Sequence, residues 1–235
     1  MLKVILLPGM DGTGMLFADL IAELSGICET IVISYPSDRH LDTPELVDLI
    51  RSRCPVVDPY ILLAESFSVS VAIYYAASKP FNLKGLILCA GFVVSPVHGW
   101  KRFLGSLLAP IIFRIKLPKF AAIVWLIGPS ASSSLLLAVR KALASVKPQV
   151  LVARLRFMLA CEARPELARV DVPILYFQAK RDNLVKPICL EFIQLIKPQV
   201  EVVTVEGPHL MLQRDPQRFV ETIVRFARSA ILRTR

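Results

Sequence analysis

Residues 60–77 of the chain read YILLAESFSVSVAIYYAA. The stretch opens with a continuous apolar run, as buried parallel strands do, and closes with an apolar helical segment. Ser66 stands at the junction, where the chain must turn sharply from the strand into the helix. The residues two positions before and after it, Ala64 and Ser68, are small and let the strand and the helix approach closely, although glycines are usual there. The stretch therefore predicts a tight turn that presents the Ser66 hydroxyl.

The sequence on both sides of this stretch alternates short apolar runs with longer helical patterns. Such alternation predicts βαβ units and a parallel sheet. We expect strands at residues 3–7, 30–34, 60–64, 86–89, 174–177 and 200–205. Helices are expected at residues 15–24, 43–54, 67–78, 187–196 and 216–231. The sequence thus predicts an α/β fold with about six mostly parallel strands flanked by helices.

The alternation stops between Ser95 and Pro165. This segment has no convincing strand pattern and holds several helical stretches punctuated by prolines. At 235 residues the chain is long enough for one well-buried core and short for two independent domains. We therefore expect one core built from residues 1–94 and 166–235, with a helical insertion at residues 95–165.

A serine hydroxyl is a weak nucleophile until a neighbouring base removes its proton, so a histidine is needed near Ser66. The sequence has three histidines, His40, His98 and His209. His209 follows the last predicted strand and so lies at the carboxyl edge of the sheet, where catalytic groups of α/β folds collect. We interpret His40 as an exposed loop residue and His98 as part of the hinge into the insertion. His209 is the expected general base.

The histidine in turn needs an acid that orients it. Asp182 follows the predicted strand at residues 174–177 and so lies at the same edge of the sheet as His209. The order along the chain is Ser66, Asp182, His209, which is the order of the α/β-hydrolase arrangement. Three residues of the required types, each after its own strand, predict a catalytic triad.

A developing oxyanion needs backbone N–H groups aimed at it. The segment LLPGMDGTG at residues 6–14 supplies a glycine-rich turn after the first strand. We assign the N–H groups of Met10 and Phe67 to this oxyanion hole. The glycines of this segment lack the Gly-Lys-Ser/Thr ending and the GxGxxG spacing of phosphate-binding loops, so no nucleotide site is expected.

Four segments together resemble a known family: PGMDGTG at residues 8–14, the Ser66 turn, DNLV at 182–185 and GPH at 207–209. They resemble the α/β-hydrolase superfamily over essentially the whole chain. The chain is most similar to small cytoplasmic esterases, including those that release methyl esters from acyl groups on carrier protein. In that resemblance the insertion at residues 95–165 is a helical cap over the active site. The first segment departs from the family in having Pro-Gly where His-Gly is commoner.

The composition is 54% hydrophobic, with a mean hydropathy of +0.57. Prolines and basic residues interrupt the most apolar region, residues 104–128, so no uncharged run reaches the ~20 residues of a membrane-spanning helix. The five cysteines are an odd number without a CxxC pair, which argues against a disulfide framework and a zinc site. We expect a cytoplasmic protein that uses no metal and no organic cofactor.

The formal charge of +9 is unevenly distributed. Between Lys101 and Arg164 there are eleven Lys and Arg residues against one acid, Glu162. Such a field attracts anionic partners, and we name Arg154 and Arg156 as candidate partner-binding residues. Three partners fit: an acidic acyl carrier protein, a coenzyme A thioester or an anionic membrane surface. Nucleic acid is not expected, because no recognised binding motif is present.

These residues together predict two-step acyl transfer, in which Ser66 attacks an ester carbonyl, His209 takes its proton and water later releases the acyl group. Part of the apolar run at residues 120–127 is expected to line an acyl pocket. We therefore expect a serine carboxylesterase for small-molecule esters of apolar acyl groups, with an acyl group on a carrier protein as one form of substrate. An acyl-CoA thioesterase or acyltransferase with the same triad is an alternative. A non-catalytic binding protein of the same fold is another.

Overall fold

The computed structural model describes residues 1–97, 99–114, 127–128 and 131–233. Its centre is a six-stranded sheet in the order β2-β1-β3-β4-β5-β6, and every neighbouring pair is parallel. The strands are β1 (Leu2–Leu7), β2 (Cys28–Val32), β3 (Tyr60–Glu65), β4 (Leu83–Cys89), β5 (Ile174–Ala179) and β6 (Glu201–Val205). The prediction of an α/β fold with about six parallel strands is confirmed.

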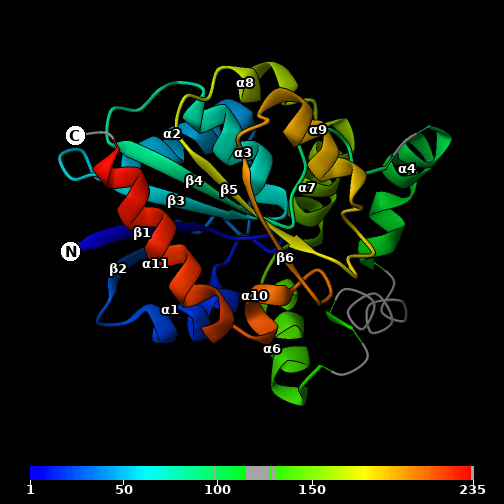
Figure 1. Ribbon diagram of the computed structural model, residues 1–235. Helices are drawn as coiled ribbons and strands as arrows, with labels where there is room; N and C mark the ends of the chain where they lie inside the picture. The colour runs from blue at the N-terminus through cyan, green and yellow to red at the C-terminus, as the bar shows by residue number, and fades with distance from the viewer. Residues whose placement is uncertain (98, 115–126, 129–130, 234–235) are drawn as a thin grey trace.

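Helices cover both faces of the sheet (Figure 1). One face carries α1 (Ala18–Leu24) and α11 (Gln217–Leu232), with the short elements η1 (Met15–Phe17) and α10 (Met211–Arg214) beside them. The other face carries α2 (Thr43–Arg53), α3 (Phe67–Ala76), α8 (Arg164–Ala168) and α9 (Ile188–Ile196). The sheet is therefore the middle of three layers.

The two apolar cores lie between these layers, and strand periodicity explains them. In β3, Ile61 and Leu63 pack into the core under α1 and α11, whereas Leu62 and Ala64 pack into the core under α2 and α3. Successive side chains of a strand point to opposite faces, so a strand covered on both faces must be apolar throughout. All six residues of β3 are buried, which accounts for the continuous apolar run over its first five positions.

Among the starts of the six strands, those of β2 and β4 differ most from the prediction. β2 lies two residues earlier than expected, at Cys28–Val32, and β4 begins at Leu83, three residues earlier. β2 is an edge strand that pairs only with β1, and most of its residues are half-buried, so its apolar pattern is weak. The second residue of β4 is the half-buried Lys84, which interrupts the apolar pattern at the start of the strand.

The described part of the predicted insertion includes the helices α4 (Trp100–Arg114), α6 (Ser133–Ala144) and α7 (Pro148–Ala160). They lie beyond the carboxyl ends of the strands, with α4 and α7 on the side of the molecule opposite the N-terminus and α6 at the bottom of the view (Figure 1). The expected acyl-pocket residues 120–126 and the expected hinge residue His98 lie outside the described residues. None of the described helices combines the length and apolarity needed to cross a bilayer.

Candidate active site

Ser66 lies between the end of β3 and the first residue of α3, with φ 51° and ψ −112°. A positive φ is sterically unfavourable for a residue with a side chain, so this backbone is strained. The Ser66 N–H donates to the Cys89 carbonyl oxygen at 2.8 Å, which ties the strained residue to the end of β4. The predicted sharp turn is therefore present, and the surrounding sheet holds it.

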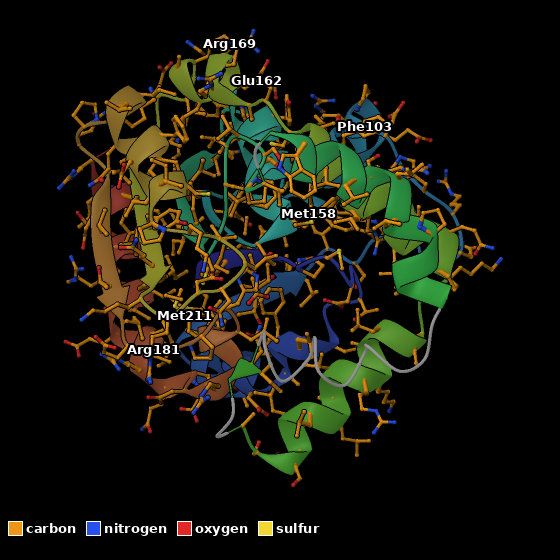
Figure 2. The ribbon with its side chains drawn as sticks, turned by 90° about the vertical axis from the view of Figure 1, so that its right-hand side faces the viewer. Phe103, Met158, Glu162, Arg169, Arg181 and Met211 are labelled. Atoms are coloured by element: carbon orange, nitrogen blue, oxygen red, sulfur yellow. The ribbon has the colours of Figure 1, made fainter. Side chains whose placement is uncertain are left out.

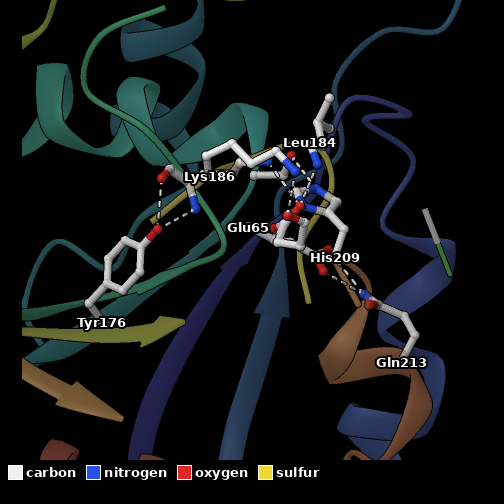
Figure 3. A network of polar contacts seen from close by, with 10 residues as sticks. Glu65, Tyr176, Leu184, Lys186, His209 and Gln213 are labelled. Carbon is white, nitrogen blue, oxygen red and sulfur yellow. Dashed lines mark hydrogen bonds and ion pairs between the residues drawn. The ribbon is translucent and has the colours of Figure 1, made fainter. Parts of the chain in front are cut away.

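Three side chains from the carboxyl edge of the sheet meet in one buried row. The Ser66 Oγ lies 2.8 Å from Nε2 of His209, and Nδ1 of His209 lies 2.6 Å from Oδ2 of Asp182. Each of the three residues is at most 6% exposed. Figure 3 shows His209 at the centre of this polar network. The structure thus brings together the three residues that the sequence singled out.

Backbone groups orient Asp182. Its Oδ1 accepts hydrogen bonds from the Leu184 N–H at 2.7 Å and the Val185 N–H at 2.9 Å. These two bonds occupy one carboxylate oxygen and leave Oδ2 aimed at His209. The ring of His209 is therefore held in the orientation that presents Nε2 to Ser66.

The charge state of His209 reflects competing effects. Burial lowers the pKa of His209, whereas the hydrogen bond and the charge of Asp182 raise it, and the charge of Glu65 adds to the rise. The net result is a His209 pKa above the ordinary value of 6.5. Because a general base must be neutral to accept a proton, this shift predicts that the base loses function at mildly acidic pH.

The segment after β1 lies directly against Ser66. A Cβ placed on Gly9 would be 3.9 Å from the Cβ of Ser66, and the Gly12 N–H donates to the Gly9 carbonyl oxygen at 3.0 Å, which closes a tight turn. In the described part of the chain the N–H groups of Met10 and Phe67 have no acceptor among the hydrogen bonds found. Their assignment to an oxyanion hole stays a prediction.

Arg154 is placed differently from the expectation. The residue comes from α7, is 4% exposed, and donates to three backbone carbonyl oxygens: Met10 at 3.0 Å, Asp11 at 2.7 Å and Pro36 at 2.8 Å. Its guanidinium also lies over the ring of Tyr35. The prediction of Arg154 as a partner-binding residue is wrong, because the side chain is buried and its donors are directed to these backbone carbonyl oxygens.

Arg156, two residues further along α7, is exposed. It lines an open cavity of about 590 Å³ together with His40, Pro110, Val152 and Phe157. Ser66 and His209 are not among the lining residues of this cavity. His40 is exposed in a loop, as expected. A partner role for Arg156 stays a prediction.

Ser68 has a role that its position in the motif does not reveal. Its hydroxyl donates to the Pro8 carbonyl oxygen and lies 2.6 Å from the Tyr35 hydroxyl. A glycine at this position could make neither contact. The hydroxyl therefore ties the start of α3 to the segment after β1, at a position where the family pattern usually has a glycine.

Glu65, the residue before the nucleophile, is also buried and polar. Nε2 of Gln213 in α10 donates to both of its carboxylate oxygens, at 2.9 and 3.0 Å (Figure 3). Burial raises the pKa of Glu65 from 4.5 to about 7, although the Gln213 hydrogen bond and the charge of His209 lower it. Oε1 of Gln213 is buried and has no hydrogen-bond partner within the described residues. No sequence motif pointed to this pair, because 148 positions separate its members.

The described residues contain no group of three or more His, Cys, Asp or Glu side chains placed to hold a metal ion. All five cysteines are free and buried. The chemistry that the described arrangement supports is therefore that of a hydroxyl nucleophile with its base, its orienting acid and adjacent N–H donors.

Comparison with known proteins identifies the family of the chain. The model of the family described as serine aminopeptidase, S33, matches residues 30–205, a range that holds Ser66 and Asp182. No protein of curated function matches the chain.

Solved structures share the fold at low identity. An esterase from Thermogutta terrifontis has 20% identity and a TM-score of 0.83, covering 98% of this chain and 90% of its own. An esterase from Exiguobacterium antarcticum has 15% identity and a TM-score of 0.83, with coverage of 97% and 92%. MenH from S. aureus has 16% identity and a TM-score of 0.76, with coverage of 97% and 94%. At these identities the likeness shows the α/β-hydrolase fold alone.

Proposed function

Because the chain belongs to the serine aminopeptidase S33 family of hydrolases, with the α/β-hydrolase fold, we propose that it is a serine carboxylesterase. In this proposal Ser66 is the nucleophile, His209 the general base and Asp182 the acid that orients the histidine. The observation that carries the proposal is the continuous hydrogen-bonded row from Oγ of Ser66 through His209 to Asp182. The esterases among the structural neighbours support the same substrate class.

The reaction proceeds in two steps. Nε2 of His209 takes the proton of the Ser66 hydroxyl as Oγ attacks the ester carbonyl carbon, and the same proton then passes to the leaving alcohol. The resulting acyl-enzyme is attacked by water, which His209 deprotonates in turn. Asp182 stays ionised throughout and stabilises the imidazolium that forms at each step.

The N–H groups of Met10 and Phe67 are the proposed oxyanion hole. Phe67 is the first residue of α3, so its N–H is at the positive end of a helix dipole and has no partner within the helix. Met10 lies in the turn that packs against Ser66. Losing one such donor costs about 3 to 4 kcal/mol of transition-state stabilisation.

The surroundings of the triad favour an apolar acyl group. The Phe67 ring lies 5.1 Å from the Phe157 ring of α7, centroid to centroid. Leu210, directly after the base, packs with Ile127 and with Val139 of α6. The residues that follow the nucleophile and the base therefore both contact apolar side chains of the predicted insertion. An apolar environment beside the reacting serine favours hydrocarbon over polar acyl groups.

We propose that residues 95–165 form a cap over a core made of residues 1–94 and 166–235. The position of α4, α6 and α7 beyond the carboxyl ends of the strands supports this division (Figure 1). Met158 of α7, labelled near the centre of Figure 2, is buried in the core on the α3 side of the sheet. A cap that shares a core with the catalytic fold can place side chains at the site.

A panel of p-nitrophenyl esters of rising acyl length, assayed with wild type and Ser66→Ala, tests the proposal. We expect hydrolysis that increases with acyl length and falls by about 10⁴-fold or more in the variant. Ser25→Ala, at an exposed turn, is the matched control and should keep full activity. A fluorophosphonate should add covalently to Ser66 in wild type alone. Wild-type activity no greater than that of Ser66→Ala on every ester would overturn the proposal.

Assays of the wild-type protein on other substrates distinguish the alternative activities. Acyl-CoA substrates in the presence and absence of an alcohol acceptor distinguish a thioesterase from an acyltransferase, and an aminoacyl p-nitroanilide tests the peptidase activity in the family's name. For a carrier-bound acyl ester, Arg156→Glu should raise KM while leaving a small soluble ester unaffected. Equal effects of Arg156→Glu on both substrates exclude a carrier role for this residue.

A further inference from the structure

Helix α4 carries a row of exposed apolar side chains. Trp100, Phe103 and Leu107 are 70%, 75% and 62% exposed, and Leu104 and Leu108 beside them are also exposed. Their spacing of three and four residues places them on one side of an α-helix. Figure 2 looks onto this side of the molecule, with Phe103 labelled on α4. Large apolar side chains in such a continuous stripe mark an interaction surface rather than ordinary surface scatter.

The opposite side of α4 is already occupied. The helix packs along α7, where Gly105 lies so close to Leu159 that an added Cβ would touch its side chain at 3.4 Å. Ala109 is fully buried. The exposed stripe is therefore not the face by which α4 packs on α7, and within the described part of the chain it is open to a partner.

Charge identifies the kind of partner. From Ser66 to Cys161 the sequence holds twelve Lys and Arg residues and no Asp or Glu. Lys101 and Arg102 are in the first turns of α4, and the exposed cations Arg140, Lys141 and Lys147 are on or next to α6. An apolar stripe with a tryptophan and a phenylalanine, set in a wholly basic region, has the composition of helices that lie in the interface of anionic membranes.

We propose that α4 is a membrane-docking helix, whose stripe of Trp100, Phe103, Leu104, Leu107 and Leu108 inserts into the interface of an anionic lipid bilayer. A second copy of the chain is the less suitable occupant, because it would bring a charge of +9 against another +9. Helix α7, on which α4 packs, supplies Arg154 and Phe157 to the site, so docking places the bilayer one helix from the triad. The idea that the bilayer supplies the apolar ester rests on the proposed function. The docking of α4 on the bilayer does not depend on that function.

Vesicle sedimentation tests the proposal. Wild type should sediment with vesicles of phosphatidylcholine mixed with phosphatidylglycerol, and much less with phosphatidylcholine alone or at high salt. The double variant Phe103→Ser, Leu107→Ser should bind anionic vesicles about tenfold more weakly. Both side chains are exposed, so the fold should survive. Val56→Ser with Phe81→Ser, which are 86% and 88% exposed outside the predicted cap, is the matched control and should bind like wild type.

Two further readouts complete the test. Tryptophan emission should shift to shorter wavelength on adding anionic vesicles, and Trp100→Phe should lose that shift. Ser66→Ala should bind vesicles normally, so a failed esterase assay and failed docking are distinguishable. No sedimentation of wild type, unchanged sedimentation of the double variant, or stripe-dependent binding to an acidic carrier protein or to a second copy in place of vesicles would each overturn the proposal.

Discussion

The guanidinium group of Arg154 donates a hydrogen bond to the Met10 carbonyl oxygen at 3.0 Å, although 144 positions separate the two residues. This contact joins α7 of the predicted cap to the turn that carries the proposed oxyanion N–H. A Cβ on Gly12 would lie 2.4 Å from Nη1 of the same guanidinium, so the turn closes around the arginine. Arg154 therefore holds the backbone of the turn that carries the proposed oxyanion N–H.

Arg154→Ala should lower kcat by about 10²-fold while changing KM little, because the oxyanion donor acts mainly in the transition state. Arg154→Lys should recover only part of the loss, since a lysine cannot reach three carbonyl oxygens at once. Added guanidinium at low concentration should partly restore Arg154→Ala. Arg218→Ala on α11, which is exposed, is the control. If Arg154→Ala unfolds at a lower temperature than wild type but keeps the wild-type kcat, Arg154 has a structural role alone.

The acidic limb of the pH profile of kcat/KM should depend on Glu65. The pKa of His209 lies above its ordinary value, and the charge of Glu65 contributes to the rise. Wild-type kcat/KM should therefore fall as the pH drops through a value above 6.5. In Glu65→Gln this limb should move to lower pH, because the carboxylate charge near His209 is gone. Glu221→Gln, which changes an exposed carboxylate, is the control and should leave the limb unchanged. An acidic limb of Glu65→Gln at the same pH as that of wild type would contradict the coupling.

Stability should also depend on Glu65. Burial raises its pKa from 4.5 to about 7, so between these values the folded protein holds a proton that the unfolded chain has released. The free energy of unfolding of wild type, measured relative to Glu65→Gln, should therefore fall as the pH rises through this window, by about 3 kcal/mol in total. Urea unfolding of both proteins across the window measures the difference. A difference independent of pH would show that Glu65 titrates normally.

Gly91→Ala should damage both stability and catalysis. A Cβ at Gly91 would lie 2.1 Å from Cγ2 of Val69, in the first turn of α3, so the helix that follows the nucleophile must shift. The hydroxyl of Tyr176 also brackets Gly91, donating to its carbonyl oxygen at 2.8 Å and accepting from its N–H at 3.1 Å (Figure 3). We expect a loss of about 1 to 3 kcal/mol in unfolding free energy and a lower kcat.

Gly105→Ala is the matched control for this change. Its Cβ would make only an ordinary contact at 3.4 Å with Leu159, and alanine is the better residue within a helix. Thermal unfolding and ester hydrolysis of both variants give the comparison. Equal behaviour of the two variants would mean that α3 tolerates the shift.

The sheet and the row of three residues were predictable because they depend on local patterns. Continuous apolar runs mark strands buried on both faces, and a parallel sheet brings the residues after its strands to one edge. Ser66, Asp182 and His209 each follow such a run, so their meeting at hydrogen-bond distance required no knowledge of side-chain packing. The weak pattern of the edge strand β2 accounts for its shifted boundary.

The roles of Arg154, Ser68 and Glu65 depend on contacts between residues far apart in the chain, which local pattern does not encode. The charge pattern grouped Arg154 with Arg156, yet packing buries the first and exposes the second, because they point to different sides of α7. Ser68 looked like a substitute for glycine, and only the approach of Pro8 and Tyr35 gives its hydroxyl two partners. Sequence alone therefore determined the fold and the three residues of the hydrogen-bonded row, whereas tertiary packing decided which polar side chains hold the turn after β1 and lie close to His209.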